Sequence, residues 1–255
     1  MTHGIITAMD WLNRKGKSAA IRLVQLTGKR PYRIHPKHLI AFPGHDWYVP
    51  HLHRDDVVLD LGCGNGVHTL VAARHVQRVI GLDRDQRQLD IALTLTMQAL
   101  NVTLLQADLV RPLPFPDGYC DAVLCLDLIE HVHARTGLLR EIHRVITPTG
   151  RLLISAPNRG TTWRRRLTRA GLFAFSDEDH KVEYSASEFR EELYQGGFTT
   201  DALEPIVYDT PWAGLIDAIG GLSLTLYARL SRWKRAMAIR HPEESTGFRA
   251  VAWKR

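Results

Sequence analysis

The segment from Val57 to Gly66 constrains the fold more than any other part of the chain. It reads Val-Val-Leu-Asp-Leu-Gly-Cys-Gly-Asn-Gly, so a run of aliphatic residues ends at Leu61 and alternate glycines follow. Such a run is typical of a central parallel strand that is buried on both faces. The glycines allow a tight reversal and let a ligand lie against bare backbone, ahead of a helix predicted over 67–76. The segment predicts a strand, loop and helix that bind a nucleoside-type cofactor.

The spacing of these glycines indicates which cofactor. A dinucleotide-binding loop reads G-x-G-x-x-G, whereas Gly62, Gly64 and Gly66 alternate and Val67 stands where the third glycine would be. Asp60 precedes the loop by two residues, and its charge would repel a pyrophosphate but suits a ligand with a cationic amino acid part. The pattern argues against an NAD-dependent dehydrogenase. It resembles motif I of the class I S-adenosylmethionine-dependent methyltransferases.

This resemblance implies a cofactor and the residues that hold it. The cofactor would be S-adenosyl-L-methionine, and the residues implied at the loop are Asp60, Gly62, Cys63, Gly64 and Gly66. Taken on its own, Cys63 could equally be a small apolar filler.

The residues after the next two predicted strands continue the match. Asp83 follows the strand at 78–82, where the family places an acid on both ribose hydroxyls, and Arg84 beside it would lie by the adenine. Asp108 and Leu109 follow the third strand, where the family places an acid near the adenine amino group. Two simpler readings stay open, since Asp83 could merely cap the next helix and Asp108 could be a solvated loop acid.

A further match follows the fourth predicted strand, 122–126. The sequence Asp-Leu-Ile-Glu-His-Val at 127–132 resembles the same segment in small-molecule methyltransferases of ubiquinone and menaquinone biosynthesis. Its position makes Asp127 and His131 candidate catalytic residues, with Asp127 near the methyl group and His131 as a base. The segment lacks the Pro-Pro-aromatic pattern of enzymes that methylate amino groups of bases.

A second candidate base lies in the block at 177–189. This block resembles one in small-molecule and glycan-tailoring methyltransferases, where a histidine and a tyrosine precede a capped helix. His180 would then lie on a loop that can face the substrate, while Ser185 or Ser187 caps the helix. As alternatives, His180 could be a surface histidine beside acids and His131 a packing histidine.

Strands and helices alternate along the chain, which predicts an α/β fold with a doubly wound, mostly parallel sheet. The resemblance implies a Rossmann-like sheet of seven strands, with the sixth ending near Tyr208 and the seventh beginning near Phe248. We expect a basic helical cap over residues 1–50 and a methyltransferase domain over 51–255. Within this domain, a helical insertion would occupy about 211–242.

The charge is unevenly distributed along the chain. The net charge is +6, but residues 46–150 carry −4, so the flanking segments carry +10. Basic residues gather at 14–37, 159–169 and 229–240. Three such runs argue for an anionic partner. RNA stays open as that partner, because positive charge supplies much of non-specific nucleic-acid binding. However, the basic runs lack the interleaved aromatic residues of a nucleic-acid platform, so we favour a partner other than nucleic acid.

The insertion contains an apolar segment, Trp212 to Leu230. Leu215, Ile219 and Leu222 recur at three- and four-residue steps, which predicts one helix with an apolar stripe. The segment is shorter than the about 20 apolar residues of a bilayer span. It could lie in a membrane interface, cover an amphipathic substrate, or pack on the domain or in a dimer.

The number and spacing of the cysteines indicate the cellular compartment and whether the chain holds a cysteine metal site. There are three, without a C-x-x-C pair, so the sequence indicates neither a disulfide framework nor a metal site. We expect a cytoplasmic protein, with peripheral contact to the inner face of a membrane as a hypothesis.

Together these features predict transfer of a methyl group to an oxygen or carbon of a small or lipid-linked acceptor, such as an anionic glycan or a quinone-like head group. An RNA or protein methyltransferase and a non-catalytic partner subunit of the same fold are the alternatives. The oligomeric state stays open.

Overall fold

The computed structural model describes residues 2–29, 35–40 and 46–255, and the chain divides into two compact units. The first, here called the helical unit, consists of Met1–His45, Asn158–Glu178 and Pro205–Gly247. The second, the sheet unit, consists of Asp46–Pro157, Asp179–Glu204 and Phe248–Arg255. The predicted cap at 1–50 and the predicted insertion at 211–242 thus fall mostly in one unit, although they are separate in sequence.

One sheet of eight strands runs in the order β3-β2-β1-β4-β5-β8-β6, and β7 pairs with β8. The strands are β1 (Val57–Leu61), β2 (Arg78–Asp83), β3 (Val102–Gln106), β4 (Cys120–Cys125), β5 (Ile146–Pro157), β6 (Phe198–Thr199), β7 (Glu204–Pro205) and β8 (Gly247–Lys254). The pairs from β3 to β5 are parallel, and β6 is antiparallel to β8. The sheet is therefore mostly parallel, as predicted.

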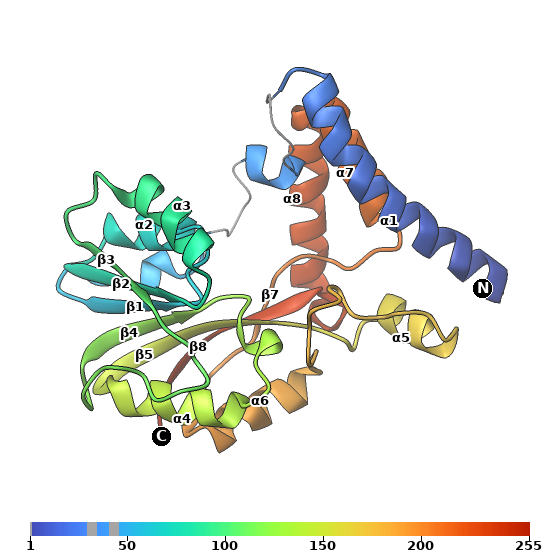
Figure 1. Ribbon diagram of the computed structural model, residues 1–255. Coiled ribbons are helices and arrows are strands. Elements are labelled where there is room, and N and C mark those ends of the chain that lie inside the picture. The colour runs from blue at the N-terminus through green and yellow to red at the C-terminus, as the bar shows by residue number, and fades with distance from the viewer. Residues whose placement is uncertain (1, 30–34, 41–45) are drawn as a thin grey trace. The chain divides into compact units, whose positions relative to one another are not determined.

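Helices cover both faces of this sheet (Figure 1). They are α2 (Val67–Ala73) and α3 (Gln86–Thr96) on one face, and α4 (Arg135–Val145) and α6 (Ala186–Gln195) on the other. Successive side chains of β1 point to opposite faces of the sheet and so pack against both layers of helices. Val58 packs in a cluster with Ala72 of α2, whereas Leu59 packs in a cluster with Leu139 of α4. This arrangement is the expected doubly wound α/β fold.

The sheet has eight strands where seven were expected. The difference lies in the predicted sixth strand, which is divided into β6 and β7. Between them the Thr200 hydroxyl donates to the carbonyl oxygen of Ala202 at 3.0 Å, so the chain turns locally instead of continuing the ladder. Near the predicted end of the strand, Tyr208 makes one isolated bridge to Ser245.

The helical unit contains α1 (His3–Leu26), α5 (Thr162–Arg169), α7 (Ala213–Leu222) and α8 (Leu224–Arg240). Its 3₁₀ helices are η1 (Pro36–Leu39) and η4 (Pro242–Glu244). The helix α1 lies along α7 (Figure 1), and Ile6 of α1 packs with Trp163 and Leu167 of α5. Among the described residues, no helix is both long enough and apolar enough to cross a bilayer.

The apolar segment of the insertion forms two helices, where one was predicted. The break falls at Ser223, whose backbone is extended (φ −138°, ψ 108°). Its hydroxyl oxygen accepts the backbone N–H of Leu226 at 3.3 Å and so caps α8. The three- and four-residue spacing of the apolar residues continues from Leu222 to Leu226 across Ser223, so this spacing alone did not predict the break.

Candidate active site

The residues predicted to bind the cofactor emerge at one edge of the sheet. In the parallel register, Leu61 pairs with Leu82, Asp60 with Leu124, and Asp83 with Gln106. The glycine loop, Asp83, Asp108 and the segment after β4 therefore all follow the carboxyl ends of neighbouring strands. This is the edge at which doubly wound sheets bind ligands.

The three glycines of the loop all have a positive φ, of 67° at Gly62, 51° at Gly64 and 80° at Gly66. A Cβ atom on Gly66 would lie 2.8 Å from the Cβ atom of Ala92, so glycine lets the loop approach α3. A Cβ atom on Gly64 would meet no atom within 4 Å. The backbone at Gly64 is therefore open to a ligand, as a cofactor lying against it requires.

Asp83 joins the loop to the end of β2. Its Oδ2 atom accepts the backbone N–H of Gly64 at 2.9 Å, and its Oδ1 atom accepts that of Asp85 at 2.9 Å. Asp85 caps α3 by accepting the N–H of Arg87, so the helix cap is Asp85 and not Asp83. Each oxygen of Asp83 keeps a second lone pair for a ribose hydroxyl. The chemistry of this position fits the predicted cofactor.

Asp60 lies inside the sheet unit, beneath the loop. It is 2% exposed, and its Oδ2 atom accepts the hydroxyl of Thr69 at 2.6 Å. Burial raises the pKa of Asp60 to about 7, and the nearby charge of Asp83 adds to this rise. Its direct contact with a cofactor stays a prediction.

Cys63 is also buried. Burial raises the pKa of the Cys63 thiol to about 12, and its Sγ atom lies 3.1 Å from where a Cβ atom on Gly81 would stand. The close fit against Gly81 supports its reading as an apolar filler, which does not exclude contact of its backbone with a ligand.

The other predicted adenine and ribose contacts lie further along the same edge. Arg84 is exposed, and its carbonyl oxygen accepts the side chain of Gln106 at 3.1 Å. Asp108 is exposed, whereas Leu109 is buried in the core. Contact of these residues with a cofactor stays a prediction.

Asp127 has a left-handed backbone, with φ at 50°, alone among the non-glycine residues that the structure describes. Its backbone N–H donates to the Ser155 hydroxyl oxygen at 2.9 Å, and that hydroxyl donates to the Asp127 Oδ1 atom at 2.7 Å. Backbone strain of this kind persists where the surroundings fix it, and it gathers at functional sites. Ser155 was not predicted as a site residue because it lies on another strand, β5.

The structure brings together the two histidines that were predicted as separate candidate bases. His131 ends the 3₁₀ helix η3 (Ile129–His131), and its ring centroid lies 4.8 Å from that of His180 at an interplanar angle of 76°. His131 is exposed, whereas the side chain of His180 is only 8% exposed. His180 therefore lies inside the sheet unit, which rules out its reading as a surface histidine.

Two buried carboxyl groups, those of Glu183 and Glu130, lie near the ring of His180. The Nδ1 atom of His180 lies 2.9 Å from the Oε1 atom of Glu183, and its Nε2 atom lies 3.9 Å from the Oε1 atom of Glu130. The backbone N–H of Lys181 donates to the Glu130 carbonyl oxygen at 2.7 Å, which ties the His180 loop to η3. Neither glutamate was predicted as a site residue, although Glu130 is adjacent to His131.

Glu130 is buried at the centre of this cluster. Burial above all raises the pKa of Glu130 to about 8, and the charges of Asp127 and Glu183 contribute to this rise. Its Oε2 atom has no hydrogen-bond partner in the described part of the chain. Buried carboxyl groups with raised pKa values are frequent in catalytic sites.

Glu130, His131 and His180 could also hold a cation. Each offers one ligand atom, and these atoms lie within 4.8 Å of one another. Two imidazoles and a carboxylate form a donor set that suits several divalent metals. No local sequence pattern indicates this donor set, because His180 is distant from Glu130 and His131 along the chain.

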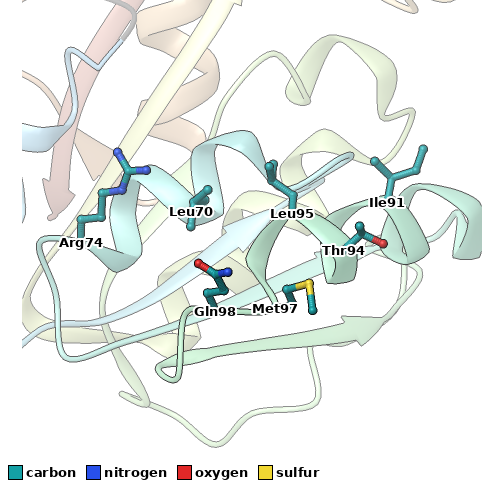
Figure 2. Close-up of a pocket in the computed structure, with 7 residues that line it drawn as sticks. All are labelled: Leu70, Arg74, Ile91, Thr94, Leu95, Met97 and Gln98. Carbon is teal, nitrogen blue, oxygen red and sulfur yellow. The ribbon is translucent and has the colours of Figure 1, made fainter.

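An open groove lies away from this edge, on the outer side of α2 and α3 (Figure 2). Its lining residues are Leu70, Arg74, Ile91, Thr94, Leu95, Met97 and Gln98. None of them was predicted to bind the cofactor.

The comparison with protein families agrees with the edge just described. Residues 59–154 match the family described as a methyltransferase domain, and they contain the glycine loop, Asp83, Asp108 and the segment at 127–132. The chain contains a class I S-adenosylmethionine-dependent methyltransferase domain. The cofactor of this methyltransferase domain is S-adenosylmethionine. Its positive charge suits the acidic residues at the strand ends.

Two curated relatives match the methyltransferase domain. A probable S-adenosylmethionine-dependent methyltransferase of Mycolicibacterium smegmatis is 33% identical over 148 residues, which are 56% of this chain and 52% of that protein. A ubiquinone biosynthesis O-methyltransferase of Pseudomonas aeruginosa is 30% identical over 106 residues, 40% of this chain and 44% of that protein. The chain spans about half the length of the curated relatives it matches.

Among solved structures, the [4+2]-cyclase SpnF resembles the chain with a TM-score of 0.60 at 20% identity, over 82% of this chain and 79% of that protein. This likeness shows the fold. Because that protein is named for a cyclisation, the methyltransferase fold by itself leaves the reaction open.

Proposed function

We propose that the protein transfers a methyl group from S-adenosylmethionine to an oxygen or carbon of a small or lipid-linked acceptor, such as an anionic glycan or a quinone-like head group. The observation that carries the proposal is the His131–His180 pair, with Glu183 behind it. His131 follows the fourth strand, at the sheet edge that also bears the glycine loop and Asp83, and His180 contacts His131 there. A group that can accept a proton therefore stands at the edge that is proposed to bind the cofactor.

The cofactor, when bound, supplies a methyl group on a positively charged sulfur, which is already activated for displacement. The chain's own residues position the reactants and shape the charge around them. Asp83 offers lone pairs to a diol, Gly64 leaves the backbone open, and Asp127 adds a negative charge at the same edge. An edge with several carboxylates favours a cationic ligand.

An acceptor hydroxyl or an acidic carbon must lose a proton as it attacks. His131 is the exposed member of the pair, so it is the one that reaches an acceptor. Glu183 accepts a hydrogen bond from the Nδ1 atom of His180 and thereby sets which ring nitrogen faces Glu130. His180 then supports His131 through the edge contact of their rings.

The acceptor class rests on the relatives and on charge. The Pseudomonas relative is named for O-methylation in ubiquinone biosynthesis, which favours a small acceptor over RNA or protein. The basic runs of the flanking segments support an acceptor or surroundings with negative charge.

The test is to incubate the protein with methyl-labelled S-adenosylmethionine and a total extract of its host, and then to separate organic solvent, small polar molecules, protein and RNA. We expect label in the organic phase or among small molecules, and none with heat-denatured protein. Label confined to RNA or protein would overturn the acceptor class. Absence of label from every fraction would overturn the methyl transfer itself.

A further inference from the structure

The helices α1 and α7 expose an apolar surface on one side of their contact. It consists of Ile5, Leu12 and Leu26 of α1 with Leu215 and Leu222 of α7, and we call it the apolar face. These five side chains are between 49% and 80% exposed. Soluble proteins rarely expose large contiguous apolar patches, and such patches commonly mark interaction sites.

The five residues belong to one side because of how the two helices pack. Gly16 contacts Gly214 so closely that a Cβ atom would lie 2.3 Å from the Gly214 oxygen, and Gly221 contacts Leu23 in the same way. Low numbers on α1 thus meet low numbers on α7, so the helices run parallel, side by side (Figure 1).

The helical period then places the exposed stripes. On α1, residues 5, 12 and 26 recur at multiples of seven, and on α7 so do residues 215 and 222. At about 100° per residue, the α1 stripe is turned by roughly 60° from its contact with α7, and the α7 stripe is turned by roughly 100° in the opposite sense from its contact with α1. In a parallel pair, turns of opposite sense face the same side. The opposite side of α7 is covered, since Gly220 contacts Tyr227 of α8 and Pro36.

Charge on the same unit indicates what could cover the apolar face. The helical unit carries 18 lysines and arginines and seven acids, a net charge of +11 with neutral histidines, whereas the sheet unit carries −5. Lys15 and Arg22 of α1 are exposed, and the helical period places both along the outer border of its apolar stripe. Trp212 is exposed beside the start of α7.

We propose that the apolar face docks on the surface of an anionic lipid bilayer. A helix surface that combines an apolar stripe, bordering lysine and arginine and a tryptophan at its end lies in a membrane interface, with the leucines in the acyl boundary and the cations among the head groups. A second copy of the chain is the weaker occupant, because it would bring two units of +11 together. Anionic lipid instead neutralises that charge.

The docking is measured with the full chain and vesicles, by sedimentation, in the absence of S-adenosylmethionine. Vesicles of phosphatidylcholine alone are compared with vesicles that contain phosphatidylglycerol. We expect binding to the anionic vesicles that is at least tenfold tighter than to the neutral ones and that weakens as salt is added. Since no methyl transfer is involved, the result is independent of the proposed activity.

Three variants locate the surface. Leu12→Glu with Leu215→Glu places charge in the apolar face, and we expect at least a tenfold loss of anionic-vesicle binding. Leu93→Glu is the matched control, since Leu93 is 61% exposed on α3 in the sheet unit, and it leaves binding unchanged. Lys15→Gln with Arg22→Gln keeps the apolar face and lowers binding several-fold.

Retention of full binding by Leu12→Glu with Leu215→Glu would overturn the proposal, and so would equal binding to neutral and anionic vesicles. A dimer seen by light scattering, which this variant dissociates, combined with no vesicle binding, would assign the face to a second copy. If the leucine variant loses its fold by circular dichroism, the Lys15 and Arg22 variant decides, since unchanged vesicle binding there contradicts the role of charge.

Discussion

The Nδ1 atom of His180 lies 2.9 Å from the Oε1 atom of Glu183, and both side chains are almost fully buried. A buried carboxylate at this distance fixes the orientation of the imidazole. His180 in turn contacts His131, which is open to an acceptor.

Glu183→Gln removes the charge behind His180 but keeps the size of the side chain. Because an amide holds the His180 ring less firmly than a carboxylate does, we expect methyl transfer to fall about tenfold or more. The loss should fall on kcat and leave the affinity for S-adenosylmethionine unchanged, which a general loss of structure would not do. Steady-state kinetics and calorimetry of both proteins measure this, and full activity of the variant would remove Glu183 from the mechanism.

Asp83→Ala should weaken binding of S-adenosylmethionine at least tenfold. The reason is the loss of both the ribose contact and the 2.9 Å bond that holds the Gly64 N–H. Asp85→Ala is the control, since it loses the cap of α3 and about 1 kcal/mol of stability but no predicted cofactor contact. Calorimetry of both variants checks the difference, and equal affinities would contradict the role of Asp83.

Gly66→Ala and Gly64→Ala should separate stability from binding. At Gly66 a Cβ atom would meet Ala92 at 2.8 Å on a backbone with φ of 80°, so we expect a loss of roughly 2 kcal/mol in unfolding free energy. At Gly64 the Cβ atom enters open space, so cofactor affinity should fall more than stability. Denaturant unfolding and calorimetry measure the two effects, and the reverse order would contradict the assigned roles.

Asp60→Asn tests the buried carboxyl group beneath the loop. Since folding raises the pKa of Asp60 from 3.8 to about 7, its neutral form is favoured in the folded state. The wild-type protein therefore loses stability from this group as the pH rises from about 4 to about 7, by about 4 kcal/mol at most. The asparagine variant lacks this loss, so its stability relative to wild type should increase over the same pH range. Thermal unfolding at pH 5 and pH 8 measures it, and a constant difference would contradict the shift.

Local sequence signals predicted much of the sheet unit. The run at 57–61 formed β1, and Ser185, one of the two serines predicted to cap α6, does so together with Glu188. The alternate glycines predicted a tight turn after β1, and all three have a positive φ. These signals act over few residues, so they are visible in one sequence.

Long-range contacts account for what was missed. Ser155 and Asp127 come together only because β4 and β5 are neighbours, and Glu183 becomes part of the site only when the His180 loop reaches η3. The break at Ser223 depends on a cap that the hydrophobic period does not reveal. The pairing of α1 with α7 depends on glycine contacts between segments about 200 residues apart.

Methyl transfer at the histidine pair is tested most directly by the release of S-adenosylhomocysteine and by the incorporation of labelled methyl groups into host extract. The proteins compared are wild type, His131→Ala, His180→Ala and His133→Ala. His133 is exposed two residues after His131 and serves as the matched control. We expect transfer by wild type and His133→Ala, and at least a tenfold loss in the other two. Transfer that is equal in all four proteins, or absent from wild type, would contradict it.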